Sequence, residues 1–120
     1  MAWAAGFFDG EGCIYFKVLD NRYKTLQMSL SISQNAFKGE PLDKWYRIFK
    51  VGGFSDSNMG RGNENPISTW RTAKFEHIQY IISSIWFMLG EVKRNQYTRM
   101  MKTYLDTKPW IDKRGRPLSV

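Results

Sequence analysis

Residues 25–34 read TLQMSLSISQ, and polar and apolar side chains alternate through this stretch without interruption. Side chains of an extended strand point to opposite faces in turn, so the leucines, the methionine and the isoleucine share one face. The preceding stretch CIYFKV alternates in the same way, and residues 20–22 are typical of a turn. The sequence therefore predicts a hairpin with one apolar and one polar face. Such a hairpin folds stably only when other elements cover its apolar face.

Segments with helical patterns precede and follow this hairpin in the sequence, and we expect these helices to cover its apolar face. Small side chains recur at helical spacing over residues 2–9, and EPLDKWYRIFK carries a proline in its first turn. Further helices are expected over about 74–89 and from 91 onwards, while GGFSDS and ISTWRT read as two more strands. The predicted order is helix, hairpin, helix, hairpin, helix, helix, in one α+β domain of 120 residues. Residues 106–120 form a basic tail that is expected to be loosely held.

The charge and the cysteine count limit the classes of partner and site. Eighteen Lys and Arg against eleven Asp and Glu give a formal net charge of +7, which favours nucleic acid first and an anionic membrane surface second. The run IQYIISSIWFML is shorter than the ~20 apolar residues of a membrane span, and the first residues lack a basic leader, so we expect a soluble intracellular protein. Cys13 is the single cysteine and His77 the single histidine, which excludes an internal disulfide and argues against a cysteine or histidine metal site.

The stretch AAGFFDGEG at residues 4–12 places two carboxylates between glycines at the end of a small-residue helix. Four small or acidic residues follow one another at i, i+3, i+4 and i+7, namely Ala2, Ala5, Gly6 and Asp9. Such spacing predicts one flat helix face, which another backbone can approach closely. The glycines at the end of the stretch then stop the helix.

AAGFFDGEG resembles the LAGLIDADG motif of homing endonucleases, and SISQN after the second strand and EVKRNQ at the last helix strengthen the resemblance. It extends from Ala4 to about Leu105 and includes one copy of the motif. It implies an αββαββα(α) half-domain over residues 1–105, with a four-stranded antiparallel, saddle-shaped sheet and all helices on one face. Single-motif members of the family pair through their motif helices, so it also implies a homodimer in which the face formed by Ala2, Ala5, Gly6 and Asp9 packs against its twin.

The resemblance implies a site-specific endonuclease that cuts double-stranded DNA at a long pseudo-palindromic target during intron or intein homing. The host would be a microbe, a phage-infected cell or an organelle. The second acidic residue of the motif binds divalent metal in this family, which assigns metal binding to Glu11, with Mg²⁺ as the expected ion and Mn²⁺ or Ca²⁺ able to occupy the site. Gln34 would position water, and Lys93 would stabilise charge at the scissile phosphate. Glu11 departs from the founding consensus, which has aspartate there.

DNA contacts are implied for the polar face of the predicted sheet. The residues concerned are Tyr15, Lys17, Thr25, Gln27, Ser29 and Ser31, with Lys38, Arg61 and Arg71 as further candidates. Without the resemblance, such a face is typical of an ordinary solvated sheet.

Three other functions stay open at this point. The same fold without cleavage would act as an RNA-splicing maturase, with intron RNA as a partner, or as a DNA-binding regulator. A basic protein that uses its sheet for protein contacts would show no salt-sensitive binding to nucleic acid.

Overall fold

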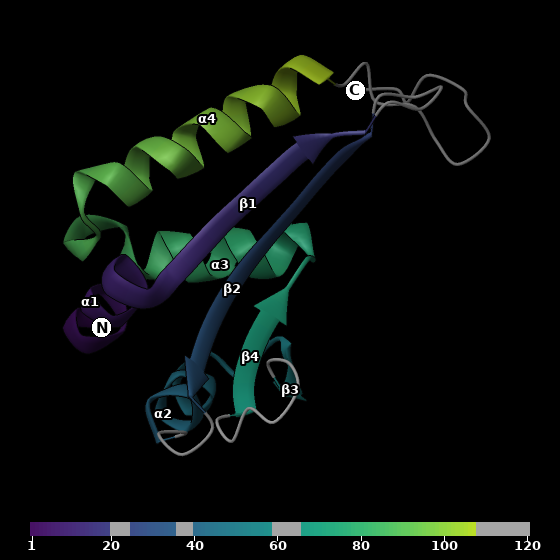
Figure 1. Cartoon of the computed structure of the whole chain (residues 1–120). Coiled ribbons are helices and arrows are strands. Elements are labelled where there is room, and N and C mark those ends of the chain that lie inside the picture. The colour runs from purple at the N-terminus through teal and green to yellow at the C-terminus, as the bar shows by residue number, and fades with distance from the viewer. Residues whose placement is uncertain (20–24, 36–39, 59–65, 108–120) are drawn as a thin grey trace.

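The computed structural model describes residues 1–19, 25–35, 40–58 and 66–107 of the chain (Figure 1). In chain order its elements are α1 (Ala2–Glu11), β1 (Gly12–Val18), β2 (Leu26–Asn35), α2 (Glu40–Phe49), β3 (Gly53–Asn58), β4 (Pro66–Thr72), α3 (Phe75–Ile85), the 3₁₀ turn η2 (Trp86–Met88) and α4 (Glu91–Thr107). The α+β class and the predicted element order are confirmed. The single helix expected over 74–89 is divided, because α3 stops at Ile85 and continues as η2.

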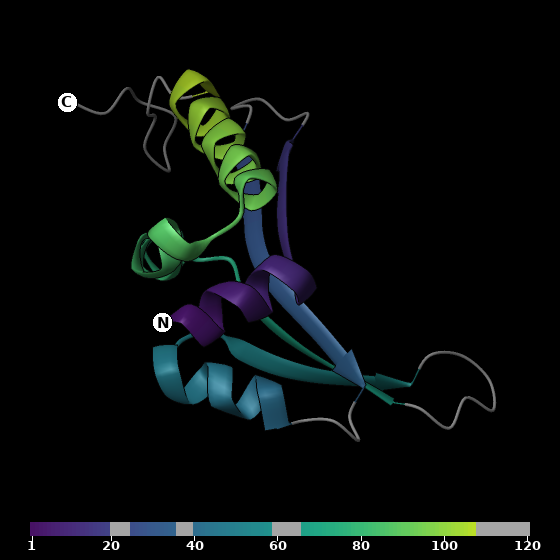
Figure 2. The same cartoon turned by 90° about the vertical axis from the view of Figure 1, so that its left-hand side faces the viewer.

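The four strands form one sheet in the order β1-β2-β4-β3, and every neighbouring pair is antiparallel. The two hairpins therefore meet through β2 and β4, while β1 and β3 form the edges. Figure 2 shows the helices on one side of this sheet, as the resemblance implied. The opposite face of the sheet carries no helix in the described part of the chain.

The apolar face of the sheet packs on the helices and forms the core. Leu30 and Ile32 of β2 are buried, as the alternation in TLQMSLSISQ predicts. Trp45 of α2 lies at the centre of an aromatic cluster, with its ring centroid 5.7 Å from that of Phe8 and 5.4 Å from that of Trp70. This cluster joins α1, α2 and β4, so the motif helix is anchored to the sheet through its aromatic side.

The turn before β3 depends on a glycine. Gly52 has φ 90°, a left-handed conformation that other residues rarely adopt, and a Cβ there would overlap the indole of Trp70. That indole donates a hydrogen bond from Nε1 to the carbonyl oxygen of Val51 at 2.8 Å. The close approach fixes β3 against β4 at the start of the second hairpin.

The long helix α4 packs on β1 and β2 and buries Met100. Its Tyr97 ring meets Trp86 of η2 edge-on at 5.8 Å between centroids. Burial raises the pKa of Tyr97 and of Tyr104 above the ordinary phenol value, so both phenols stay neutral at physiological pH. None of the described helices has the length and the apolar character needed to cross a lipid bilayer.

Candidate functional site

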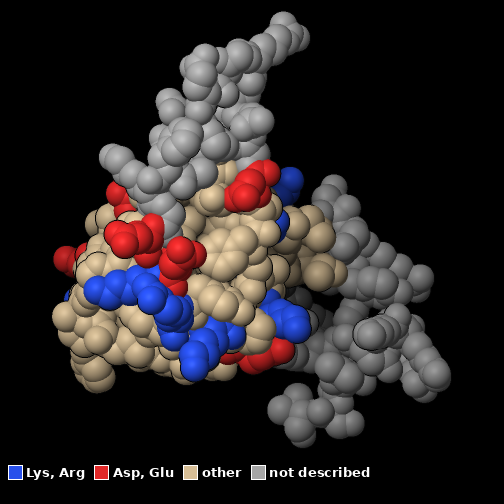
Figure 3. Space-filling view, turned by 90° about the horizontal axis from the view of Figure 1, so that it is seen from below, with Lys and Arg blue, Asp and Glu red and all other residues tan. Residues whose placement is uncertain are grey.

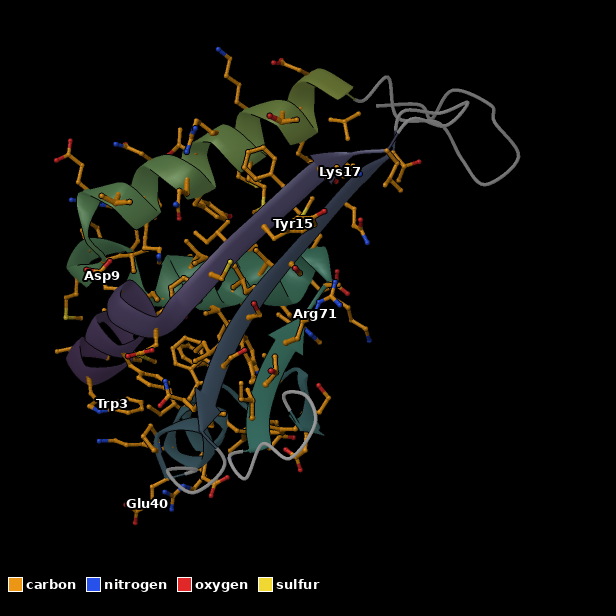
Figure 4. The ribbon with its side chains drawn as sticks, in the orientation of Figure 1. Trp3, Asp9, Tyr15, Lys17, Glu40 and Arg71 are labelled. Atoms are coloured by element: carbon orange, nitrogen blue, oxygen red, sulfur yellow. The ribbon has the colours of Figure 1, made fainter. Side chains whose placement is uncertain are left out.

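The open face of the sheet gathers the polar residues that the sequence placed on one side of the strands. Directly paired residues of antiparallel strands share a face, and the register pairs Tyr15 with Ser29 and Lys17 with Gln27. Ser31 pairs with Arg71 of β4 on the same face. Figure 4 shows Tyr15 and Lys17 along β1, with Arg71 on β4. The strand pairing therefore brings candidates from the first three strands of the sheet together on a single surface.

These candidates differ in how far solvent reaches them. Tyr15 is 42% exposed, and Lys17, Gln27 and Arg71 are also exposed. Ser29 is only 3% exposed, so its hydroxyl cannot reach a ligand while its neighbours keep their positions. A ligand can therefore reach the longer side chains of this face, those of Tyr15, Lys17, Gln27 and Arg71, but not the hydroxyl of Ser29.

Three other candidates need separate treatment. Thr25 is exposed just before β2, and its carbonyl oxygen accepts a hydrogen bond from the amide of Leu19 at 2.7 Å. Lys38 and Arg61 lie outside the described residues, as does the tail from 108 to 120.

The last helix continues to Thr107, slightly beyond the domain boundary expected at residue 105.

The register also places on the open face residues to which the sequence-based assignment gave no DNA contact. They are Cys13, Ser33, Ser55 and Thr69. The hydroxyls of Ser33 and Thr69 are 2.9 Å apart, so β2 and β4 are joined by a side-chain hydrogen bond on this face. Alternation in CIYFKV and ISTWRT already indicated Cys13 and Thr69, since each is two residues from an assigned residue on the same strand.

Glu11 ends α1, and the next residue already begins β1. Its side chain is exposed and makes no hydrogen bond or ion pair with the rest of the described chain. A free carboxylate of this kind suits a hard divalent cation, which prefers oxygen ligands. Within the described residues, no three His, Cys, Asp or Glu side chains come together in a way that could hold a metal ion.

Gln34 lies near the C-terminal end of β2, beyond the point where Ile32 pairs with Gly12. It is half-buried and pairs with Ser68, on the face that carries Ile32 rather than on the open face. The β1–β2 ladder ends at the pair of Ile32 with Gly12, so Gln34 lies two positions beyond the residue that is paired next to Glu11. Gln34 is separate from the surface formed by Tyr15, Lys17 and Arg71.

Lys93 lies in the first turn of α4 and is half-buried. The start of this helix is tied to α1, because the amide of Gly90 donates to both carboxylate oxygens of Asp9 at 3.1 Å. Asp9 and Glu11 belong to the same last turn of α1. The fold thus joins the segment with Glu11 to the segment with Lys93, although the two are far apart in sequence.

The exposed side of α1 is smaller than the sequence predicts. Ala2, Gly6 and Asp9 are exposed, but Ala5 is completely buried in the core of its own subunit. The helix turns Ala5 inward because it lies next to Ala4 and one turn before Phe8, which are also buried. The exposed side of α1 therefore includes Ala2, Gly6, Asp9 and Gly10, but not Ala5.

Apolar side chains extend this exposed surface beyond α1. Phe87 and Met88 of η2 are 92% and 50% exposed, and Val92 of α4 is 69% exposed. The 3₁₀ turn packs against α1, so these side chains lie on elements next to the motif helix. Large apolar side chains with this much exposure are candidates for contact with another protein surface.

Charge is mixed at the end of the molecule that carries α2. Figure 3 shows Lys and Arg side chains beside Asp and Glu side chains on this end. The helix itself contains Glu40, Asp43, Lys44 and Arg47, and the ammonium of Lys44 lies 4.4 Å from the ring centroid of Trp3. This end of the molecule therefore carries charges of both signs.

Comparison with known proteins matches the chain to one family model, described as LAGLIDADG endonuclease, over residues 4–104. Among curated proteins, no relative matches.

Solved structures show the same fold. The homing endonuclease I-CvuI in complex with its target, in the presence of Ca, is 23% identical with a TM-score of 0.62; the match covers 79% of this chain and 59% of that chain. The meganuclease I-AabMI bound to uncleaved DNA is 20% identical with a TM-score of 0.68, over 96% of this chain and 40% of that one. I-SmaMI bound to cleaved DNA is 21% identical with a TM-score of 0.69, again over 96% and 40%. The chain therefore spans 59% of the first of these proteins and 40% of each of the other two.

Proposed function

Since this chain belongs to the LAGLIDADG endonuclease family, we propose that it is a site-specific DNA endonuclease that works as a homodimer in intron homing. It hydrolyses phosphodiesters on both strands of a long pseudo-palindromic target with a divalent metal ion, Mg²⁺ in the cell. One observation carries the proposal: the exposed carboxylate of Glu11 lies at the end of the motif helix, directly before the sheet with the open polar face.

The open face of the sheet binds the DNA. Its reachable side chains combine an amide (Gln27), two cations (Lys17, Arg71) and a phenol (Tyr15), which are donors and acceptors suited to base edges and phosphates. I-CvuI and I-AabMI have the same fold, and their structures were solved with DNA. This supports the assignment of the open face to DNA binding.

Two copies of the chain meet through α1. Gly6 and Gly10 leave open space beside the helix, so a second backbone can approach closely. The apolar side chains of η2 and Val92 extend this contact.

The two Glu11 carboxylates of the dimer hold the metal, because like charges brought together need cations between them. Bound Mg²⁺ would supply a Lewis acid that activates water and neutralises the scissile phosphate. Gln34 orients the attacking water through its amide. Lys93 donates from its ammonium to the phosphate oxygens, where negative charge grows during the reaction.

A plasmid that carries the uninterrupted host junction tests the proposal. We expect the wild-type chain to linearise this plasmid in Mg²⁺ and to leave intact a plasmid in which the two halves of the junction are exchanged. Binding to the junction without any cut in Mg²⁺ or Mn²⁺ would contradict the endonuclease. That outcome would favour the maturase or the regulator instead.

DNA affinity should fall steeply with salt. The dimer carries a formal charge of 2 × 7 = +14, and each phosphate contact releases counterions. We expect the association constant to drop about a thousandfold between ~50 and ~200 mM salt. Fluorescence anisotropy with labelled duplex measures this drop, and an affinity indifferent to salt would contradict a polyanion-binding face.

Lys17→Ala and Gln27→Ala separate the two kinds of contact on this face. Lys17→Ala should weaken binding to all sequences and reduce the salt dependence, because it removes a cation. Gln27→Ala should mainly relax base preference at one position of each half-site. The two residues are paired across β1 and β2, so the variants probe the same part of the sheet.

A further inference from the structure

A single side chain connects the motif helix to the last helix of the fold. Both carboxylate oxygens of Asp9 lie 3.1 Å from the amide nitrogen of Gly90, although the two residues are separated by 81 positions. The carbonyl oxygen of Gly90 in turn accepts the amide of Arg94 at 3.0 Å, which closes the first turn of α4. Asp9 therefore holds the residue from which α4 starts.

The contact leaves little room at Gly90. A Cβ on Gly90 would lie 2.5 and 2.8 Å from the two carboxylate oxygens of Asp9, so the carboxylate would have to shift from its place on the amide. A negative charge at the start of a helix is also favoured by the positive end of the helix dipole.

Asp9 and Gly90 each lie close in sequence to a residue that we propose as catalytic. Asp9 precedes Glu11 by two positions in the last turn of α1, and Gly90 precedes Lys93 by three positions at the start of α4. We infer that Asp9 is a positioning residue, whose hydrogen bond to Gly90 sets Lys93 relative to Glu11 within one subunit. This inference rests on the proposed function, because it concerns the geometry of that reaction.

The inferred role differs from the one that the sequence suggests for Asp9. The small-residue spacing places Asp9 on the face between two copies of the chain, whereas its carboxylate makes its contact within the subunit. A positioning role predicts a loss in the chemical step, because small displacements of reacting groups cost up to about a hundredfold in rate. An interface role predicts a loss in dimerisation and DNA binding instead.

Four variants test the inference: Asp9→Ala, Asp9→Asn, Gly90→Ala and the double variant Asp9→Ala/Gly90→Ala. Asp9→Ala should slow single-turnover cleavage at saturating DNA by about tenfold to a hundredfold, with the Kd for DNA unchanged. Asp9→Asn should recover most of the rate, because its amide oxygen still accepts from Gly90. Gly90→Ala should slow cleavage in the wild-type background and have little further effect with Asp9→Ala, since the clashing carboxylate is then gone. Asp43→Ala, at an exposed aspartate of α2, is the matched control.

Amide hydrogen exchange gives a readout that does not need cleavage. In Asp9→Ala the amides of Gly90 and Arg94 should exchange faster than in the wild type, because the first loses its acceptor and the second is bonded to the carbonyl of Gly90, and Asp9→Asn should restore their protection. If exchange is unchanged in Asp9→Ala, or if Asp9→Ala cuts at the wild-type rate, the inference is wrong. If the exchange pattern appears but the wild type cuts no DNA, the connection between the helices stands and the proposed endonuclease fails.

Discussion

Glu11→Gln should abolish cleavage and leave DNA binding intact. The amide keeps the size and position of the side chain but removes the negative charge that holds the metal. Metal assistance contributes several kcal/mol to phosphodiester hydrolysis, and each ~1.4 kcal/mol is tenfold in rate, so we expect a loss of about a thousandfold or more. Affinity for DNA should stay equal or increase, because two carboxylates near the phosphates become neutral. Single-turnover cleavage and anisotropy on the same duplex measure both quantities.

Glu76→Gln, at an exposed glutamate in the first turn of α3, is the control and should cut at the wild-type rate. Lys93→Ala should also slow cleavage, but without weakening metal binding, since its proposed contact is with the phosphate. Wild-type activity of the Glu11→Gln dimer in Mg²⁺ would remove Glu11 from the catalytic site.

Gly6→Leu should separate the two copies while each subunit stays folded. A Cβ at Gly6 meets no other atom of the chain within 4 Å, so the new side chain would enter the space that we propose for the partner's helix. Replacement of a helical glycine also favours the helix by about 0.5–1 kcal/mol, so the melting temperature of the subunit should not fall. Cleavage should be lost, because one chain supplies one Glu11 and one sheet.

Sedimentation equilibrium and thermal unfolding together test this result. Gln79→Leu places the same side chain on the exposed face of α3 and should remain dimeric. The account of the interface fails if Gly6→Leu dimerises as tightly as the wild type. It fails equally if the wild type is a monomer at micromolar concentration in the presence of DNA.

Much of the fold could be predicted because strong periodicity decides it. Clean alternation over residues 25–34 set both the strand and its buried face, and the structure buries Leu30 and Ile32 as expected. The break between α3 and η2 was missed, because the apolar pattern continues through Trp86 while the backbone tightens into a 3₁₀ turn. Nothing in local spacing distinguishes these two helical forms.

Part of the candidate site was predicted from the sequence. The features that were not predicted depend on tertiary packing between elements far apart in the chain. Small-residue spacing grouped Ala5 with Gly6, but packing of α1 on the core turned Ala5 inward. Ser29 has the right strand parity, yet its neighbours cover it. The bond between Asp9 and Gly90 joins segments far apart in the chain, so only the folded structure shows it.

The most direct test of the account adds Mg²⁺ to a preformed complex of the wild-type chain with the plasmid that carries the uninterrupted host junction. Linear DNA is followed with time, and a parallel sample receives EDTA. We predict that the complex contains two chains per site, that linear product accumulates only after Mg²⁺ is added, and that EDTA stops it. Cleavage that continues in EDTA, or a two-chain complex that never yields linear DNA in Mg²⁺, would contradict a metal-dependent endonuclease built on paired Glu11 residues.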